Sequence, residues 1–397
     1  MYLHTYGKNI KKFIRERKIK VKLICHKQQL LKIINTVQKA VSAKSIMPIL
    51  ECIKIDANAN GKLTVYGNNL DICIEYNDIA NIFEGGQIAI SSKIFGEIIR
   101  RLPDTDVTIY VNEENNVMTI KCGKSEFNIQ GLSSIEYPAV PFVSEVYKFS
   151  LKQSALKKMI RKTIFSVSQN EARKPVLTGA LFEIEAGVLS IVTTDGYRLS
   201  ICKEVVNSSL NSVKFIVPGL TLREIFKVLE DGEEKNVNII ISERHALFEF
   251  ENYKVVSRLL EGEFINYKPV LMTPNSIFVT CKTMALSESL ERASLLINDD
   301  ITSKAEKVPV RLSITCDKIE ITCMTGKGKV YDIVDVKASG DDLEIGFNHR
   351  YLLDALRACE DDEIKLEFSN PRSSCFIRSA KGDDSFTFMI LPVRLYN

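Results

Sequence analysis

The stretch Val21-Lys22-Leu23-Ile24-Cys25, which leads into an amphipathic helical pattern, occurs in similar form three times in this chain. Tyr147-Lys148-Phe149-Ser150-Leu151 and Ile277-Phe278-Val279-Thr280-Cys281 are each followed by a helical pattern as well. The three stretches begin at positions 21, 147 and 277, so they are offset by 126 and 130 residues. A pattern that recurs at one period indicates copies of one structural unit.

A second helical pattern repeats at nearly the same period. It occurs as Ile98-Ile99-Arg100-Arg101-Leu102, Ile225-Phe226-Lys227-Val228-Leu229 and Ala355-Leu356-Arg357-Ala358-Cys359. Prolines at 138, 141, 269 and 274 fit extended linkers, because proline cannot donate a hydrogen bond to a sheet. We therefore predict three similar domains at 21–143, 144–272 and 273–397, each near the common domain size.

The first 20 residues differ in charge from the rest of the chain. They contain seven basic residues and one acid, a sum of +6, whereas the whole chain of 397 residues is +3, so residues 21–397 sum to −3. No uninterrupted apolar segment follows these charges, as a signal peptide would require. We expect residues 1–20 to be a disordered basic extension; the alternative is a basic arm that contacts nucleic acid.

Within each repeat, a strand and a helix are followed by several short strands, and the order then recurs. Short turns between the strands favour antiparallel sheets over parallel ones. We predict an α+β fold in which two helices cover one face of the sheets in each domain. The periodicity predicts helices over residues 27–41, 91–102, 153–166, 219–229, 283–296 and 349–359.

The polar faces of these helices are mostly basic. In 153–166, Leu156, Met159, Ile160 and Ile164 form the apolar side, and the opposite side carries four cations: Lys157, Lys158, Arg161 and Lys162. Like charges at i,i+4 spacing repel each other, so the sequence tolerates a small cost there. Cations also recur on the other predicted helices, although the third repeat adds Glu288 and Glu291. Cations segregated on one face are typical of phosphate-backbone binding. A solvated basic face is the commoner explanation for any single helix, but the recurrence in all three repeats favours binding to DNA.

Common catalytic and metal-binding motifs do not occur. The ten cysteines form no C-x-x-C pair, so we expect reduced core residues in a cytoplasmic protein, with neither a metal nor a cofactor. No apolar run approaches the roughly 20 residues of a membrane span. Asp195, followed by Gly196, could belong to a nucleophile loop, but Asp-Gly between two apolar strands is more simply a tight turn. The chain is therefore not expected to be an enzyme. A hydrolase that uses Asp195 is one of three hypotheses for the function of this chain, and it is the least favoured of them.

Several motifs resemble the bacterial β sliding clamp, the processivity subunit of DNA polymerase III. Thr194-Asp195-Gly196-Tyr197-Arg198-Leu199 and Leu391-Pro392-Val393-Arg394-Leu395 resemble two signatures of that family. Met47-Pro48-Ile49-Leu50-Glu51, Gly346-Phe347-Asn348 and Leu177-Thr178-Gly179 resemble further family positions. The resemblance covers residues 21–397.

This resemblance implies the DNA clamp fold and a homodimer whose three-domain subunits join head to tail in a closed ring. Helices would line the hole and contact double-stranded DNA. The implied partners are the DNA polymerase III catalytic subunit, the clamp loader and other proteins that carry a clamp-binding motif. The second hypothesis is a clamp-like interaction scaffold that does not encircle DNA.

In the family, partners insert a short peptide with a glutamine and bulky apolar residues into a pocket between the second and third domains. Carried over by position, the resemblance places that pocket at fourteen residues: Leu177, Thr194, Gly196, Tyr197, Arg198, Leu199, Val270, Asn348, Tyr351, Met389, Leu391, Pro392, Val393 and Arg394. An apolar cleft with a few polar groups suits a peptide anchor. Ordinary core packing explains Arg198 and Arg394 poorly, because buried arginines are rare without a partner.

The resemblance also implies residues for the other two surfaces. Predicted DNA contacts are Lys44, Lys93, Arg173 and Lys174, to which the cationic helix adds Lys157, Lys158 and Arg161. Predicted dimer-interface residues are Phe127 in the first domain and Leu295 and Leu296 in the third. The sequence departs from the family at Ile265, Pro269, Pro175-Val176 and Tyr396-Asn397. Ile265, Pro269 and Tyr396-Asn397 bear on which peptides the pocket prefers. Pro175-Val176 replaces an aromatic pair that could stack on single-stranded DNA.

Overall fold

The computed structural model describes residues 19–112, 114–170, 174–206, 212–232, 234–298 and 308–395. The chain separates into two compact units. Unit 1 comprises Met1–Lys148 and Val237–Arg258, and unit 2 comprises Phe149–Asn236 and Leu259–Asn397. β10 (Tyr147–Lys152) crosses the boundary between them. The division into three domains, predicted from the repeats, stays a prediction.

Unit 1 contains two antiparallel sheets. The first has the strand order β5-β1-β7-β8-β9. Its strands are β1 (Ile19–His26), β5 (Asn81–Glu84), β7 (Asp106–Asn112), β8 (Val117–Cys122) and β9 (Ser125–Gln130). β9 is the last strand of this sheet, and most of its residues are exposed. Because no strand in the described part of the chain pairs with its outer side, the backbone groups there are available for pairing.

The second sheet of unit 1 combines strands from two distant parts of the sequence. Its order within this unit is β15-β16-β17-β4-β3-β2-β6. β17 pairs with β4 through Val255 opposite Ile74, which attaches the segment Val237–Arg258 to this unit. The strands are β2 (Cys52–Ala57), β3 (Lys62–Asn68), β4 (Ile72–Ile79), β6 (Gly86–Ser91), β15 (Asn236–Ile241), β16 (His245–Glu249) and β17 (Tyr253–Arg258).

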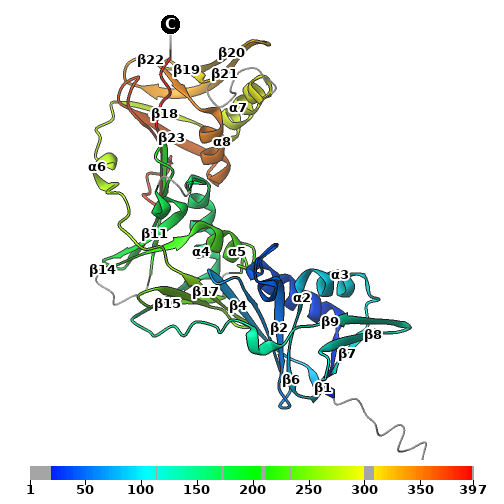
Figure 1. Cartoon of the computed structure of the whole chain (residues 1–397). Coiled ribbons are helices and arrows are strands. Elements are labelled where there is room, and N and C mark those ends of the chain that lie inside the picture. The colour runs from blue at the N-terminus through cyan, green and yellow to red at the C-terminus, as the bar shows by residue number, and fades with distance from the viewer. Residues whose placement is uncertain are drawn as a thin grey trace, which may run out of the picture. The chain divides into compact units, whose positions relative to one another are not determined.

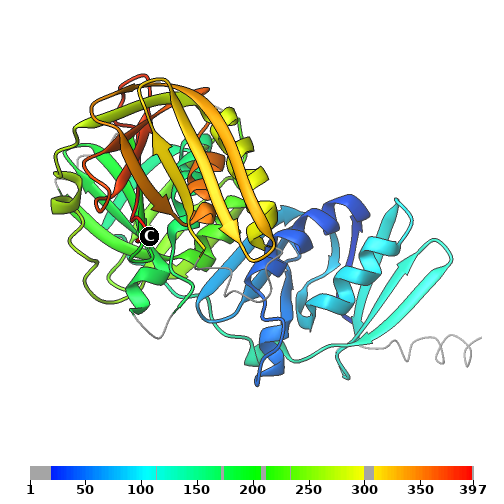
Figure 2. The same ribbon diagram turned by 90° about the horizontal axis from the view of Figure 1, so that it is seen from above.

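Two helices, α2 (Lys27–Val37) and α3 (Ser92–Arg101), contact each other in unit 1 (Figure 2). α2 buries Leu30, Ile33, Ile34 and Val37, the apolar residues spaced as on one helical face, so the predicted helix is confirmed. It ends four residues earlier than predicted, and a 3₁₀ turn at Gln38–Ala40 follows it. α3 ends before Pro103, because a residue that precedes proline disfavours the helical conformation.

Unit 2 contains one long antiparallel sheet in the order β14-β11-β12-β13-β25-β24-β23-β18-β21-β20-β19-β22. β13 pairs with β25, with Ser200 opposite Phe388, and this ladder joins strands from two of the sequence repeats. The strands are β11 (Gly179–Glu185), β12 (Val188–Thr194), β13 (Arg198–Val205), β14 (Ser212–Pro218), β18 (Ile277–Lys282), β19 (Val310–Ile314), β20 (Lys318–Thr325), β21 (Gly328–Ser339), β22 (Leu343–Phe347), β23 (Glu363–Phe368), β24 (Cys375–Ser379) and β25 (Phe386–Ile390).

The helices of unit 2 pack on this sheet. α4 contacts β12 and β13, α5 contacts β11 and β14, and α7 contacts β20, β21 and α8 (Figure 1). Their bounds are α4 (Gln153–Thr163), α5 (Gly219–Phe226), α6 (Lys268–Leu271), α7 (Thr283–Asn298) and α8 (His349–Ala358). Further 3₁₀ turns lie at Pro48–Glu51, Ser134–Glu136, Ile164–Ser166 and Pro175–Thr178. These bounds confirm the predicted α+β class and the six predicted helices, with ends that differ by a few residues.

Candidate functional site

The turn between β12 and β13 is built around Asp195. Its Oδ1 accepts hydrogen bonds from the backbone N–H groups of Tyr197 (2.9 Å) and Arg198 (3.0 Å). Gly196 has φ +91°, a conformation that residues with a side chain rarely adopt. Asp195 Oδ2 accepts from Arg198 Nε at 3.0 Å. Both carboxylate oxygens are thus engaged within the turn, which supports the tight-turn interpretation over the nucleophile loop.

Arg198 connects this turn to α8. Its Nη1 donates to Asp354 Oδ2 at 2.6 Å. The guanidinium carbon also lies 4.5 Å from the centre of the Tyr351 ring and 5.5 Å from that of Phe165. A planar guanidinium can form ion pairs at its edge and contact aromatic rings at its face, so one side chain holds the turn against the helix. Tyr351 and Arg198, both predicted pocket residues, are therefore brought together.

The C-terminal segment passes between the same turn and β22. The N–H of Leu391 donates to the Tyr197 carbonyl (2.9 Å), and the N–H of Val393 donates to the Gly346 carbonyl (2.8 Å). A Cβ at Gly346 would lie 2.9 Å from the Val393 oxygen and 2.6 Å from Leu395, so only glycine permits this approach. Gly346 was noted in the sequence as a family position, and the close approach gives it a physical role.

The fourteen predicted pocket residues form two layers. Leu177, Thr194, Leu199 and Met389 are buried, and Leu199 and Met389 belong to a core cluster that includes Tyr267. The remaining residues are half-buried or exposed and form the outer layer: Gly196, Tyr197, Arg198, Val270, Asn348, Tyr351, Leu391, Pro392, Val393 and Arg394. Arg394 is exposed, so the argument that burial sets it apart was wrong for this residue. Exposed apolar side chains at Tyr197, Val270 and Leu391 leave a surface that an apolar peptide can cover.

Sequence reasoning missed the group that anchors Val270. Tyr267, directly before α6, donates its hydroxyl to the buried carboxylate of Glu183 on β11. Glu183 Oε1 also lies 2.7 Å from Lys214 Nζ and 3.3 Å from Lys268 Nζ. Burial alone would raise the pKa of Glu183, but the two ammonium groups and the Tyr267 hydroxyl outweigh it and lower that pKa. The carboxylate therefore stays ionised and holds the linker that carries Val270.

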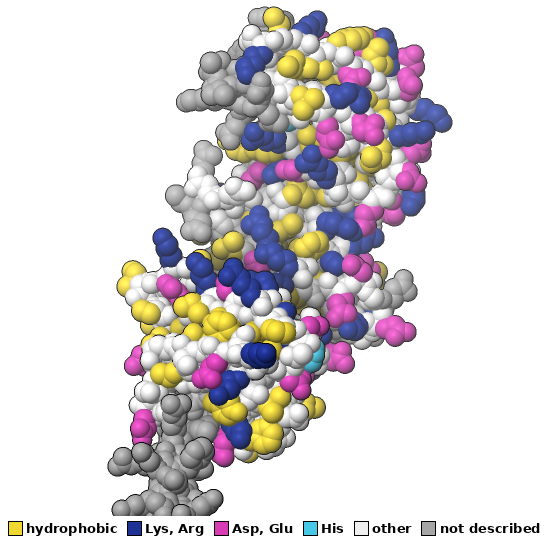
Figure 3. Space-filling model, turned by 90° about the vertical axis from the view of Figure 1, so that its right-hand side faces the viewer, with side chains coloured by type: hydrophobic (Ala, Val, Ile, Leu, Met, Phe, Trp, Pro, Cys, Tyr) yellow, Lys and Arg dark blue, Asp and Glu magenta, His cyan; other side chains and the backbone are white. Residues whose placement is uncertain are grey.

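The cations predicted to contact DNA differ in whether they are already paired with an acidic side chain. Lys157 pairs with Asp231 at 2.7 Å, and Arg161 pairs with Glu360. Lys44, Lys93 and Lys174 are exposed and Lys158 is half-buried; among the described residues none of these four has an ion-pair partner. Arg173 lies outside the described residues. Figure 3 shows basic side chains mixed with acidic ones on the face near α7 and α8, as the acidic residues of the third repeat suggested.

Lys162 does not belong to the exposed cationic face on which the sequence placed it. Its residue is only 2% exposed, and its Nζ lies 4.1 Å from the Phe386 ring centre and 4.0 Å from Glu360 Oε2. Burial, followed by the nearby Lys158, lowers the pKa of this ammonium group. The helical period predicted on which side of α4 Lys162 lies, but β25 and the segment after α8 cover that side of the helix.

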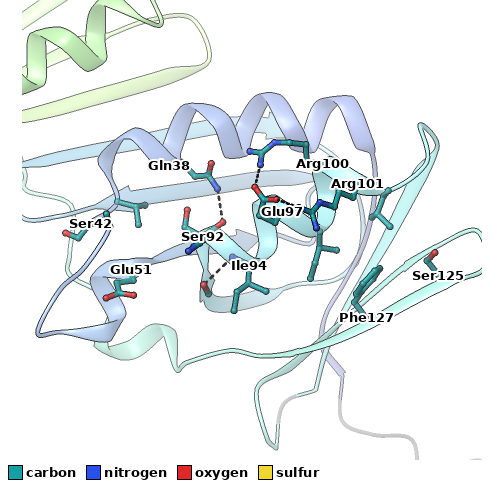
Figure 4. Close-up of a pocket in the computed structure, with 16 residues that line it drawn as sticks. Gln38, Ser42, Glu51, Ser92, Ile94, Glu97, Arg100, Arg101, Ser125 and Phe127 are labelled. Atoms are coloured by element: carbon teal, nitrogen blue, oxygen red, sulfur yellow. Dashed lines mark hydrogen bonds and ion pairs between the residues drawn. The ribbon is translucent and has the colours of Figure 1, made fainter.

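The predicted interface residue Phe127 lies on β9 and is 39% exposed. It lines a hollow of about 1020 Å³ together with Lys93, Ile94 and Arg101 of α3 (Figure 4). Glu97 forms ion pairs with both Arg100 and Arg101 along one side of this hollow. Lys93, predicted as a DNA contact, therefore lines the same hollow as the predicted interface residue.

Leu295 and Leu296, the other predicted interface residues, lie on α7 next to β21. Leu295 is 69% exposed, and Leu296 is half-buried with its Cδ1 near Gly328. The half of β21 at 328–335 pairs with β20, whereas β18 pairs only with 336–339. Among the described residues, 328–335 thus has a free edge, and Tyr331 and Ile333 are exposed on that strand.

The cysteines and the other metal-ligating side chains are dispersed in the part of the chain that the structure describes. Among the described residues, no group of three or more metal-ligating side chains gathers. All ten cysteines are free; eight are buried as predicted, whereas Cys316 is exposed and Cys359 half-buried. Burial raises the pKa of Cys52 and Cys202 to about 11, which keeps these thiols protonated. No helix in the described part of the chain is long and apolar enough to cross a membrane.

Three family models match the chain in succession. They describe the N-terminal, central and C-terminal domains of the DNA polymerase III beta subunit, and they match residues 21–141, 150–266 and 269–394. The chain is 35% identical over 377 residues to the beta sliding clamp of Halalkalibacterium halodurans, covering 91% of this chain and 97% of that one. It is 34% identical to that of Staphylococcus aureus, covering 91% and 96%. A crystal structure of the DNA polymerase sliding clamp from Bacillus subtilis superposes with a TM-score of 0.88 at 32% identity, covering 95% and 100%.

Proposed function

Because the chain belongs to the DNA polymerase III beta subunit family, the beta sliding clamps, we propose that it encircles duplex DNA and tethers the replicative polymerase to it. The observation that carries this proposal is the match of all three family domains along one chain. The role is topological and not catalytic: a tethered polymerase stays at high effective concentration near its template.

Ring closure would join two copies of the chain through their free strand edges. Among the described residues, β9 is the end of its sheet in unit 1, and residues 328–335 of β21 have a free edge in unit 2. Free edges pair readily with another chain. Phe127 and the hollow beside α3 would then receive the exposed Leu295 and Leu296 of the second copy. Because the two surfaces differ, each copy would use both, and two copies would close a head-to-tail ring.

DNA would be held by cations that contact its phosphates. Lys44, Lys93, Lys158 and Lys174 are available for this, whereas Lys157 and Arg161 would first have to leave Asp231 and Glu360. Phosphate contacts carry no sequence information, so a ring held this way can slide. Arg173 is included in the proposal on the family resemblance alone.

Partners would bind through a short peptide at the outer layer of the fourteen-residue pocket. Tyr197, Val270 and Leu391 supply apolar surface, and Arg198, Asn348 and Arg394 supply polar groups around it. The DNA polymerase III catalytic subunit and the clamp loader would compete for this surface if both use it. The buried Leu177, Thr194, Leu199 and Met389 would support its floor.

The test is retention on DNA of two topologies. The protein is loaded on a nicked circular plasmid by a clamp loader, the complex is isolated, and the circle is then cut once. Release on cutting is the expected result, because a ring slides off a free end. Retention after cutting would mean ordinary surface binding. Failure to stay on either form would favour an interaction scaffold that does not encircle DNA.

A further inference from the structure

A second cavity lies beside the C-terminal segment of unit 2. It has a volume of about 450 Å³, and its walls come from residues 308–309, from β19, β20 and β21, and from residues 393–395. Val308, Met324 and Val393 supply apolar surface. Arg311, Lys329 and Arg394 supply three positive charges.

Among the described residues, the lining of this cavity carries cations and no acidic side chain. Arg311 is paired with Glu344 of β22 at 2.9 Å, outside the lining. Lys329 and Arg394 are exposed, and neither has an acidic partner among the described residues. An anionic group entering this cavity would therefore meet two unpaired cations beside apolar walls. Complementary charge of this kind favours one partner over others.

The cavity and the proposed peptide pocket share two residues. Val393 and Arg394 belong to both, and the hydrogen bond from the Val393 N–H to the Gly346 carbonyl fixes the segment that separates them. A peptide that covers Leu391 and Tyr197 would need only a few more residues to cross this segment, since an extended chain advances about 3.3 Å per residue.

We propose that this cavity binds residues that flank the clamp-binding motif of a partner protein, and that these flanking residues are acidic with an apolar neighbour. The proposal rests on the proposed function, because the flanking residues follow a peptide already seated in the pocket. It assigns to Lys329 a role in partner preference that the motif pocket alone does not provide.

The probes are synthetic peptides that share one core, a glutamine followed by bulky apolar residues. One pair is extended at the N-terminus and one pair at the C-terminus. In each pair, one peptide carries an acidic extension of two acidic residues and a leucine, and the other carries a neutral extension of serine and glycine. Affinity for the full-length protein is measured by fluorescence anisotropy at low and at high ionic strength.

We expect one acidic extension to bind about fivefold more tightly than its neutral counterpart, the scale of one or two exposed ion pairs. The gain should shrink at high salt and disappear in Lys329→Glu. Lys337→Glu is the matched control, because Lys337 is exposed on the same face of the same strand and does not line the cavity. The mass of each variant in solution is measured alongside, since β21 also carries the proposed dimer edge.

The outcomes separate the two proposals. If the core peptide binds and neither acidic extension adds affinity, the cavity proposal is wrong and the pocket stands. A gain that survives Lys329→Glu also overturns the cavity proposal. If the core peptide does not bind the wild-type protein, the pocket assignment fails, and the cavity proposal fails with it.

Discussion

At the scale of single residues, Arg198 shows how one side chain connects two elements. It contacts Asp195 in its own turn and Asp354 on α8, while its flat face lies near the Tyr351 ring. Removing one partner of a mostly buried ion pair leaves the other charge unpaired, which costs more than the pair itself contributes. The effects on stability of substitutions at Arg198, Asp195 and Asp354 are therefore not expected to be independent.

Arg198→Ala should lower the free energy of unfolding by about 2 kcal/mol, the scale of a hydrogen bond to a charged group. Arg198→Lys should cost less, because it keeps the charge but cannot donate to two carboxylates in a fixed fork. The midpoint of urea unfolding measures both. Equal midpoints for wild type and Arg198→Ala would show that the connection to α8 adds no stability.

His349, the first residue of α8, makes stability depend on pH. It is 2% exposed, its Nε2 has no hydrogen-bond partner among the described residues, and burial followed by Arg350 lowers its pKa from 6.5 to about 4. The unfolded chain binds the proton more tightly, so the contribution is complete above pH 6.5 and is lost as the pH falls toward 4. That loss is on the order of 2–3 kcal/mol.

His349→Gln should remove this pH dependence, because glutamine does not titrate in that range. The test compares unfolding midpoints of wild type and variant at neutral pH and near pH 5. The wild type should lose more stability between the two conditions than the variant. Equal losses would assign the acid sensitivity to other groups.

At the scale of elements, α6 is held by contacts distant in sequence. Four residues form this helix, too few to be stable alone, and the Tyr267 hydroxyl and Lys268 attach it to Glu183. Burial, followed by the hydrogen bond to Glu183, raises the pKa of Tyr267, so its hydroxyl remains a donor at neutral pH.

Tyr267→Phe should lower stability by about 1 kcal/mol and weaken binding of a motif peptide, because Val270 loses its anchor. Tyr110→Phe removes a hydroxyl from a half-buried tyrosine of unit 1 and serves as the control. Peptide affinity and the unfolding midpoint are measured for both variants. If Tyr267→Phe binds the peptide as tightly as wild type, Glu183 does not position the pocket.

The proposed dimer edge makes a second prediction at this scale. Leu295→Ala combined with Leu296→Ala should yield monomers, because burial of a leucine at a well-packed contact is worth about 2–5 kcal/mol. Met284→Ala is the control, since Met284 is 67% exposed at the other end of α7. Light scattering gives the mass of each. A double variant that stays dimeric would overturn the assignment of Leu295 and Leu296.

At the scale of the whole molecule, the repeats and the family signatures specify the same architecture. The α2 pattern of Leu30, Ile33, Ile34 and Val37 predicted both a helix and its buried face, because a period of 3.6 residues is a local property. The Asp195-Gly196 turn was also predictable, since its hydrogen bonds close within four residues. The position of the peptide pocket came from resemblance and stays a prediction.

Sequence alone thus determined the repeat, the apolar faces of the helices and the turn, all of which depend on residues close together in the chain. Only the tertiary structure decided which cations are free. Lys157 pairs with Asp231, Arg161 with Glu360, and Lys162 is buried against Phe386. The Glu183–Tyr267 contact likewise spans distant positions. No local period encodes such partners, because they depend on which strands and helices meet after folding.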